Sequence, residues 1–282
     1  MKNLQLLIIG TVFIFSACST KQTDTTESQE TEAKEAMEPS VVGKEVKYSN
    51  GTIEMIGYMA YDENAQGESP GVLVVHEWWG HNAYARERAD KLAELGYVAL
   101  AVDMYGDGKT ADHPEDAGKF TQEVFSNLDE ATSRFVAALN TLKEEPNVDP
   151  DKIAAIGYCF GGSVVLSMAN AGLDLEAVAG FHAGLQLPVQ PEAGKVNAAI
   201  LVCNGADDPF VPQEQTDAWK KSMDDAGVKY TYVGYPGAVH GFTSKGADSL
   251  GAKFELPLAY NEEADIKSWD QLKVFLKDAF GE

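Results

Sequence analysis

The feature that most constrains this chain is a glycine-rich hexapeptide, Gly157-Tyr158-Cys159-Phe160-Gly161-Gly162. The apolar run 153–156 precedes it and the mostly apolar run 163–168 follows it, which predicts a strand, a sharp turn and a helix. The glycines allow neighbouring elements to approach closely around a strained turn, as in the Gly-x-Nuc-x-Gly elbow that presents a nucleophile. Cys159 would then stand at a helix N-terminus, where N–H groups and the helix dipole favour a thiolate. The alternative is a structural cysteine buried in a glycine-rich turn.

Strands and helices alternate along the rest of the chain. Continuous apolar runs predict strands at residues 71–76, 97–102, 153–156, 175–180, 198–203 and 229–235. Helical spacing of apolar residues predicts helices at residues 83–95, 128–142, 160–171, 213–226 and 266–280. Segments 45–49 and 52–61 flank the turn signal Asn50-Gly51 and predict a hairpin. The alternation predicts an α/β fold with a mostly parallel central sheet and helices on both faces, and such sheets bind ligands at the carboxyl ends of their strands.

The start of the chain indicates an export signal. Lys2 precedes an apolar segment, residues 4–15, which is too short to span a bilayer as a helix. Small residues then lead into Cys18, as in a bacterial lipoprotein signal. We therefore expect residues 1–17 to be a lipoprotein signal peptide and Cys18 to be lipidated. An ordinary signal peptide or an uncleaved anchor is the alternative.

A tether and one large domain are expected after the signal. Residues 18–40 are acidic and lack aromatic side chains, which predicts a disordered segment, and residues 41–282 are long enough for one α/β domain with a full core. The net charge of −22 argues against nucleic acid and anionic membrane surfaces as partners. We expect an exported monomer in the periplasm or at the cell surface, which contacts the membrane only through its lipid anchor. Neither a cofactor nor a metal is expected.

A nucleophile at Cys159 needs a base and an orienting acid, and the order nucleophile, acid, histidine is typical of the elbow arrangement. Asp208 lies in a Gly-x-x-Asp-x-x-Val-Pro segment directly after the strand predicted at 198–203, with Asp207 as its neighbour. His240 follows the strand predicted at 229–235. His182 precedes the acid and is therefore the weaker candidate for the base, but it could line a pocket.

On these motifs the chain, from about residue 41 to its end, resembles the dienelactone hydrolase family of α/β-hydrolases. Three further segments add to the resemblance: His76-Glu77-Trp78-Trp79-Gly80, Asp103-Met104-Tyr105-Gly106 and Tyr260-Asn261-Glu262-Glu263-Ala264. The resemblance implies that Glu77 holds the resting thiol of Cys159 and takes its proton as substrate binds. The alternative for Glu77 is a solvent-facing carboxylate in a loop.

The resemblance also implies a reaction on small-molecule esters or lactones. Cys159 would attack the carbonyl with support from His240 and Asp208, and an acyl-thioester would form and be resolved by water. Backbone N–H groups of Trp78 and Phe160 would receive the oxyanion. The substrate pocket is expected to be lined by Trp79, Tyr84, Tyr105 and His182, although aromatic residues at strand ends can also be core.

One departure limits the substrate that the resemblance implies. The best-known members of the family hold a substrate carboxylate with arginines, one of them a few residues after the histidine, whereas residues 241–245 contain none. Lys109, Lys119 or Lys245 could replace it only as point charges without the planar fork. Two other kinds of protein are alternatives: a non-catalytic binding lipoprotein on a hydrolase scaffold, and a thiol redox protein, for which no resolving cysteine is suitably spaced. Cys203 is expected in the core.

Overall fold

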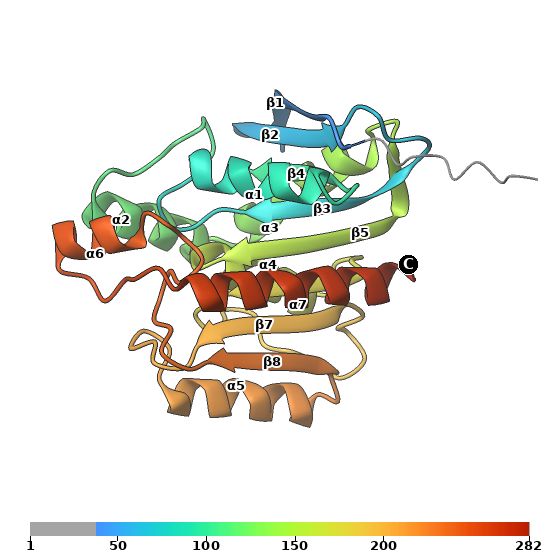
Figure 1. Cartoon of the computed structure of the whole chain (residues 1–282). Helices are drawn as coiled ribbons and strands as arrows, with labels where there is room; N and C mark the ends of the chain where they lie inside the picture. Colours follow the sequence, from blue (N-terminus) through green and yellow to red (C-terminus); the bar gives the residue numbers. More distant parts are fainter. Residues whose placement is uncertain (1–37, 282) are drawn as a thin grey trace, which may run out of the picture. The chain divides into compact units, whose positions relative to one another are not determined.

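The computed structural model describes residues 38–281, which contain an eight-stranded sheet with helices on both faces (Figure 1). The strands are β1 (Val41–Ser49), β2 (Glu54–Asp62), β3 (Ser69–Val75), β4 (Val98–Val102), β5 (Val148–Tyr158), β6 (Ala177–Phe181), β7 (Ala199–Gly205) and β8 (Tyr230–Tyr235). The helices are α1 (Ala83–Ala93), α2 (Pro114–Ser126), α3 (Leu128–Lys143), α4 (Phe160–Asn170), α5 (Gln213–Asp225), α6 (Ala247–Phe254) and α7 (Glu262–Phe280).

The sheet has the order β1-β2-β4-β3-β5-β6-β7-β8. The pairs β1–β2 and β2–β4 are antiparallel, and every other neighbouring pair is parallel. The hairpin β1–β2 turns at Asn50-Gly51, where the Asn50 side chain accepts hydrogen bonds from the N–H groups of Thr52 and Ile53. The mostly parallel sheet predicted from the sequence is confirmed, and the carboxyl ends of its parallel strands lie at one edge.

The alternating side chains of β3 explain why its sequence is apolar at every position. Val72 and Val74 pack in one core cluster with residues of α1 and α7, while Leu73 and Val75 pack in the other with residues of α3, α4 and α5. The strand is therefore buried on both faces, as expected inside a parallel sheet. In Figure 1 α1 and α7 lie in front of the sheet, and α3 and α4 lie behind it.

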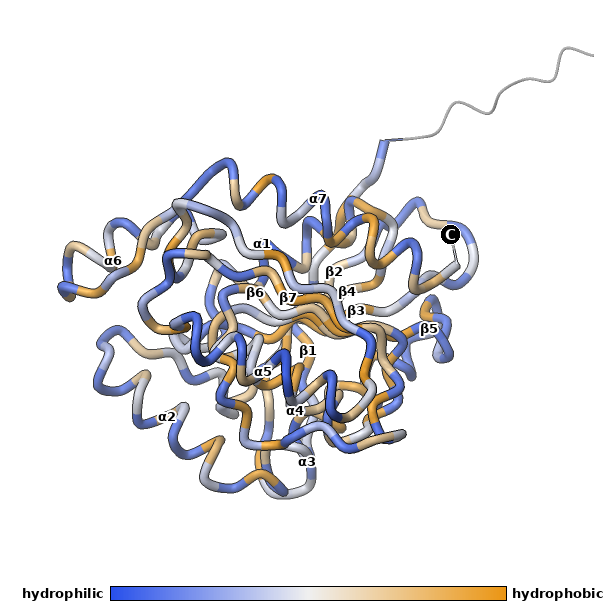
Figure 2. The backbone as a smooth tube through the Cα atoms, turned by 90° about the horizontal axis from the view of Figure 1, so that it is seen from below, coloured by the Kyte–Doolittle hydropathy of each residue, from blue (hydrophilic) through white to orange (hydrophobic). Residues whose placement is uncertain are grey.

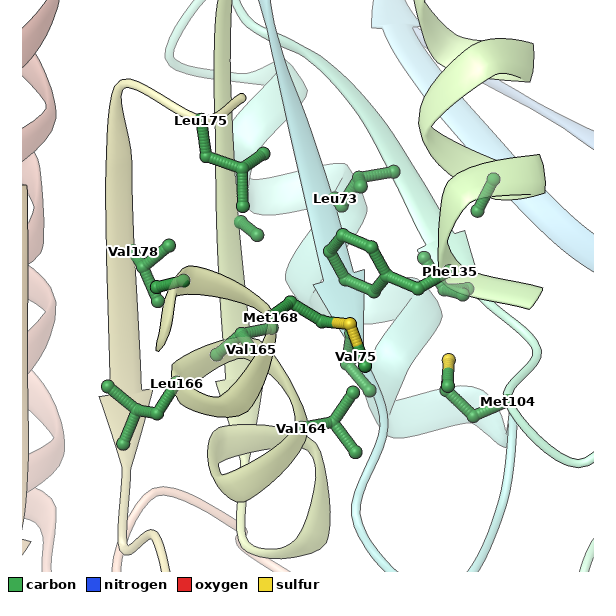
Figure 3. Packing of buried hydrophobic residues seen from close by; sticks show 14 of the residues in the cluster. Leu73, Val75, Met104, Phe135, Val164, Val165, Leu166, Met168, Leu175 and Val178 are labelled. Atoms are coloured by element: carbon green, nitrogen blue, oxygen red, sulfur yellow. The ribbon is translucent and has the colours of Figure 1, made fainter. Parts of the chain in front are cut away.

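The core cluster behind the sheet supports the turn that follows β5. Figure 3 shows Leu73 and Val75 of β3 beside Phe135 of α3 and Met168 of α4, all fully or almost fully buried. Burying one such side chain contributes roughly 1.5–3 kcal/mol. In Figure 2 the central strands are mostly orange, which marks hydrophobic residues, and the outer helices alternate between hydrophilic blue and hydrophobic orange. Helix α4 is thus fixed against the sheet along its whole length.

Two helices were not predicted from the sequence. Helix α2 buries only Ala117 and Val124, so its apolar face is too narrow to give a clear helical pattern, although Pro114 at its first turn is a start signal. Helix α6 has only eight residues. Strand β5 begins five residues before the predicted start, and α7 begins one turn earlier than expected because the Asn261 side chain accepts from Ala264 N–H.

The predictions for the export signal, for Cys18 and for most of the tether lie outside the described residues. Of the predicted tether, residues 38–40 are described, and the Ser40 N–H donates to Asp62 Oδ1 at 2.8 Å. No helix within residues 38–281 is long and apolar enough to cross a bilayer.

Candidate active site

Cys159 occupies a strained turn between β5 and α4. Its φ is +54° and its ψ is −115°, which is rare for a residue with a side chain and costs on the order of 1–3 kcal/mol. A Cβ at Gly161 would lie 2.3 Å from the Val75 carbonyl oxygen, and one at Gly157 would lie 2.1 Å from the Gly161 carbonyl oxygen. Glycine is therefore required at both positions, and the turn has the geometry that the hexapeptide predicts.

Three side chains from three strand ends form a hydrogen-bonded series. Cys159 follows β5, Asp208 follows β7 and His240 follows β8. The His240 Nε2 lies 3.0 Å from the Cys159 Sγ, and the His240 Nδ1 lies 2.8 Å from the Asp208 Oδ2. Since an ionised carboxylate can only accept, Nδ1 carries a hydrogen and Nε2 is the nitrogen that faces sulfur. The structure brings together the three residues that the sequence analysis selected.

The neighbouring aspartate has a different partner. Asp207 accepts a hydrogen bond from the Gly237 N–H at 2.9 Å on the exposed side of the loop. Asp208 is 3% exposed, and its other oxygen accepts from the Phe210 N–H at 2.8 Å. The structure therefore places Asp208, not Asp207, against the histidine. This is the register that the Gly-x-x-Asp-x-x-Val-Pro segment predicts.

The surroundings of His240 favour its protonated form. Burial by itself lowers the pKa of His240, but the adjacent Cys159 sulfur and the Asp208 carboxylate outweigh it and raise that pKa above its ordinary value. An imidazole that attracts a proton in this position can take one from the thiol and later return it to a leaving group. The geometry thus supports acid–base chemistry at the sulfur.

Glu77 lies in the loop after β3 and is buried. Its residue is 7% exposed and lines a narrow cavity together with Cys159 and His240, so it is not a solvent-facing carboxylate. Burial raises the pKa of Glu77 to about 7, while the charges of His240 and Arg88 act in the opposite direction. Among residues 38–281 its carboxylate has no hydrogen-bond partner, and the sulfur of Cys159 faces His240 instead. This arrangement differs from a resting thiol held by the glutamate.

His76 fixes the backbone next to Glu77, a role that sequence analysis missed. Its Nε2 accepts from the Met104 N–H at 3.3 Å, so Nδ1 carries the hydrogen and donates to the Glu77 carbonyl oxygen at 2.5 Å. In a planar trans peptide the N–H points away from the carbonyl oxygen, and this peptide's N–H belongs to Trp78. His76 therefore orients the Trp78 N–H. The signal for this role in the sequence was the position of His76 directly before Glu77.

Phe160 supplies a second free N–H at the elbow. It is the first residue of α4, and the first N–H groups of a helix have no partner within the helix. The Trp78 carbonyl on the opposite loop accepts a hydrogen bond from the Tyr105 hydroxyl at 2.9 Å, which holds that loop in place. Trp78 and Phe160, which the resemblance implies as oxyanion donors, line one cavity together with Cys159.

Two cavities of different chemistry lie near the elbow, and Cys159 lines only the first of them. The first has a volume of about 270 Å³ and is mainly apolar, with a lining of Trp78, Thr121, Phe125, Cys159, Phe160, Ser163, Gly184, Phe210, His240 and Leu258. The second has a volume of about 640 Å³ and carries charged groups, with a lining that includes Glu77, Trp79, Tyr84, Glu87, Asp112, Lys245 and Lys253. The narrow cavity around Glu77, Cys159 and His240 shares residues with both.

The structure corrects two of the four predicted pocket residues. Trp79 and Tyr84 line the charged cavity, as predicted. Tyr105 lines neither cavity beside Cys159, because its ring is buried between His76 and Phe160. His182 is fully buried behind His240, with ring centroids 5.2 Å apart, and therefore also lines neither. Sequence analysis missed Phe125 and Phe210; the first lies on the unpredicted helix α2, and the second lies two residues after Asp208.

Comparison with known proteins agrees with this geometry. A sequence profile of the dienelactone hydrolase family matches residues 55–280. Protein usf from Aquifex pyrophilus is 31% identical over 209 residues, which cover 72% of this chain and 88% of that protein. A solved dienelactone hydrolase-like promiscuous phosphotriesterase from metagenomic libraries is 36% identical, with a TM-score of 0.79 and coverage of 86% of this chain and 99% of that one.

A second solved structure, m3DLH, is 37% identical, with a TM-score of 0.80 and coverage of 85% of this chain and 99% of that one. The matched residues of the family profile run from β2 to the last residue of α7, and so include the elbow and every strand end described above. The chain therefore belongs to the dienelactone hydrolase family, a family of hydrolases with the α/β-hydrolase fold.

Proposed function

We propose that this protein hydrolyses small esters or lactones with Cys159 as its nucleophile. The observation that carries the proposal is the series from Cys159 Sγ through His240 to Asp208, with separations of 3.0 and 2.8 Å, at the carboxyl ends of parallel strands. A nucleophile, a base within hydrogen-bond reach and a third group that orients the base are the required parts of such a site.

In the proposed first half-reaction, His240 takes the thiol proton, the sulfur of Cys159 attacks the carbonyl carbon, and the carbonyl π electrons move to oxygen. The N–H groups of Trp78 and Phe160 stabilise that oxyanion. The oxyanion collapses, the carbon–oxygen bond to the leaving group breaks, and His240 donates its proton to the leaving alkoxide. Cys159 is left as an acyl-thioester.

Water resolves the thioester in the second half-reaction. His240 removes a proton from the water, whose oxygen bonds to the acyl carbon while the carbon–sulfur bond breaks. Asp208 keeps the imidazole in the tautomer and orientation that both steps need. Glu77 is proposed to accept the thiol proton when His240 is already protonated, because its pKa of about 7 allows it to exchange a proton near neutral pH.

The two cavities indicate how a substrate would lie. The apolar cavity of about 270 Å³ would hold an aliphatic or aromatic group against Phe125 and Phe210, and the charged cavity would hold the more polar end. Lys109 and Lys119 pair with acidic neighbours, Asp107 and Glu115, and Lys245 lines the charged cavity beside acidic groups that offset its charge. We therefore propose neutral, small substrates.

A panel of activated esters and small lactones tests the proposal. The purified chain should show turnover that Cys159→Ala abolishes and Cys203→Ala leaves unchanged. Equal activity in the wild type and Cys159→Ala would refute the cysteine mechanism. A binding lipoprotein would show no turnover on any substrate, and a thiol redox protein would instead lose reduced Cys159 on mild oxidation without hydrolysing the panel.

A second substrate class follows from one comparison. The relative that is 36% identical is named a promiscuous phosphotriesterase, and neutral triesters suit a site without an arginine at the nucleophile. We propose slow hydrolysis of neutral aryl phosphotriesters at the same cysteine. Release of the aryl alcohol from such a triester, and its loss in Cys159→Ala, is the test.

We also propose that the protein is exported, anchored by a lipid on Cys18, and monomeric. The support is the sequence of residues 1–18 together with the acidic segment that follows. Mass spectrometry of the mature N-terminus should show an acylated Cys18, and light scattering of the chain without residues 1–40 should give a monomer. An unmodified mature N-terminus at another position would refute the anchor.

A further inference from the structure

Arg88 is a buried cation close to the candidate active site. It lies on α1, is 2% exposed, and its guanidinium is 2.9 Å from the Asp265 Oδ1 in the first turn of α7. The Asp265 carboxylate also accepts from the Tyr260 hydroxyl at 3.2 Å. Buried ion pairs lose much of their hydration and do not by themselves stabilise a fold, so this pair calls for another reason.

The first consequence of the pair is a restraint on the loop that carries His240. The Arg88 guanidinium donates to the backbone carbonyl of Thr243, three residues after His240. The Thr243 hydroxyl in turn is hydrogen-bonded to the Tyr84 hydroxyl and lies 2.8 Å from the His182 Nε2. Arg88 thus connects helices α1 and α7 to this loop, and His182 packs against the His240 ring.

The second consequence is a positive charge near Glu77. The Arg88 guanidinium carbon lies 5.0 Å from the ring centroid of Tyr84 and 5.3 Å from that of Tyr158, the residue before Cys159. Tyr84 lines the same cavity as Glu77. The Glu77 carboxylate has no hydrogen-bond partner within residues 38–281, and the charge of Arg88, together with that of His240, lowers its pKa against the effect of burial.

We propose that Arg88 is a positioning residue of the hydrolytic site, which holds the His240 loop through Thr243 and keeps a positive charge near Glu77. The proposal rests on the proposed function. Residues 241–245 contain no arginine that could bind a substrate carboxylate. Arg88 lies on α1 and has a different role. Arg88 would act on the site's own groups and would not contact the substrate.

The charge half of the proposal concerns a carboxylate with several ionisable neighbours. The groups that face Glu77 are Cys159 at the elbow, Tyr84, Glu87 and Arg88 on α1, Asp112 before α2, His240 after β8, and Lys245 and Lys253 at α6. Loss of Arg88 removes a cation, so the pKa of Glu77 should rise further. If Glu77 must be ionised to accept a proton, activity should then be lost at a higher pH on the acid side.

Three variants separate charge from geometry. Arg88→Met/Asp265→Asn removes the ion pair without leaving a buried charge, and Asp265→Asn alone loosens the pair but keeps the cation. Arg86→Met removes an exposed arginine from the same helix and serves as the control. The pH profile of kcat/KM and the pH profile of Cys159 alkylation by iodoacetamide are measured for each.

The expected results differ between the variants. In the double variant kcat should fall about tenfold with little change in KM, and the acid inflection of both profiles should rise by about one pH unit. Asp265→Asn should lower kcat without raising the inflection, and Arg86→Met should match the wild type. In a Glu77→Gln background the inflection shift should disappear, because the group on which Arg88 acts is gone.

Two results would overturn the proposal: an unshifted inflection in the double variant, or a shift that persists with Glu77→Gln. If the double variant does not fold, Arg88→Lys decides, since it keeps the charge without the fork; it should lose kcat at an unchanged inflection, and wild-type kcat would refute the positioning role. If the wild type hydrolyses nothing, the proposed function fails, while the alkylation profiles still test the charge on Glu77.

Discussion

Two free cysteines of this domain differ sharply although they lie at nearly the same level of the sheet. Cys203 on β7 is in register with Phe181 of β6, and Phe181 is in register with Tyr158, the residue before Cys159. One residue along the strand direction thus separates a core cysteine from the candidate nucleophile. The turn after β5 makes this difference, because it carries Cys159 out of the sheet to the start of α4.

The surroundings of the two sulfurs differ. Cys203 is fully buried, and burial raises the pKa of its thiol to about 12 although the Tyr235 hydroxyl donates to the sulfur. Cys159 borders two cavities and has His240 at 3.0 Å. Reactivity therefore depends on position in the fold and not on the residue type.

The largest expected effect concerns the sulfurs themselves. Cys159→Ala should lower turnover by about a thousandfold or more, because it removes the sulfur that would form the acyl intermediate. Cys203→Ala should keep wild-type kcat and lose only stability, by about 1 kcal/mol, since it leaves a small cavity. Ester turnover and iodoacetamide labelling followed by peptide mapping measure both. Labelling of Cys203 in the native protein would contradict the contrast drawn here.

The next effect tests which aspartate orients the base. Asp208→Asn should lower kcat by about a hundredfold or more, because an amide facing Nδ1 favours the wrong imidazole tautomer. Asp207→Asn is the matched control and should stay within about twofold, since Asp207 only accepts from the Gly237 N–H at the surface. Steady-state kinetics on one ester suffices. If Asp207→Asn lowered kcat more than Asp208→Asn, the hydrogen-bonded series of Cys159, His240 and Asp208 would not be the catalytic one.

These assignments show what the sequence could predict. The elbow, Asp208 and His240 were selected because each follows an apolar strand and stands in a short motif, and short-range patterns of this kind survive folding unchanged. The sheet and most helices were predicted for the same reason: both faces of the parallel strands are buried, which leaves continuous apolar runs.

The rest depended on contacts between distant segments. The places of Tyr105 and His182 beneath the site follow from hydrogen bonds to Trp78 and Thr243, which no local pattern indicates. Arg88 lies within the helix predicted at residues 83–95, but its buried partner Asp265 is 177 positions later in the chain. Helix α2 was missed because it buries little, and with it the aromatic wall at Phe125.

A third effect is the pH dependence of the free energy of unfolding that Glu77 causes. Burial raises the pKa of Glu77 from 4.5 to about 7, so the folded state binds a proton that the unfolded chain releases between those values. Stability from the neutral carboxyl is present below about pH 4.5 and is lost as pH rises to about 7. Glu77→Gln should therefore raise the free energy of unfolding by about 3 kcal/mol above pH 7 and by little in acid.

Urea unfolding at two pH values measures this gain, with Glu87→Gln as a control from the same cavity. The control carboxylate is half exposed and paired with Lys91, so its substitution should change stability by less than about 1 kcal/mol at either pH. An equal gain for Glu77→Gln at both pH values would mean that the carboxylate is not desolvated. The Glu77 carboxylate would then behave like a carboxylate at the protein surface.

A smaller effect is expected from His76, which acts on the Trp78 N–H through the backbone. His76→Leu removes the donor to the Glu77 carbonyl and should lower kcat about tenfold, less than outright loss of an oxyanion donor. His76→Asn keeps a donor near Nδ1 and should recover most of that loss. Affinity for a tetrahedral transition-state analogue should fall in parallel with kcat/KM, while KM stays nearly constant. Unchanged analogue affinity in His76→Leu would remove this role.

The smallest effect concerns what the cavities around Cys159 select. A carboxylate brought into a partly apolar site needs a paired cation, and an arginine fork does this best. Within residues 38–281, the cations that line the charged cavity are Lys245 and Lys253, beside the acidic groups Glu77, Glu87 and Asp112. These acids offset the two lysines, and the net charge of −22 adds a weak, salt-screened repulsion of anions.

A neutral ester should therefore be turned over at least as well as a carboxylate-bearing ester of the same size. The measurement is kcat/KM for a matched pair of substrates at physiological salt. A preference of tenfold or more for the carboxylate corresponds to about 1.4 kcal/mol of transition-state binding, which the mixed lining does not account for. In that case one lysine must bind the anion in spite of its acidic neighbours. Lys245→Met and Lys253→Met would identify this lysine, because only substitution of the lysine that binds the carboxylate should abolish the preference.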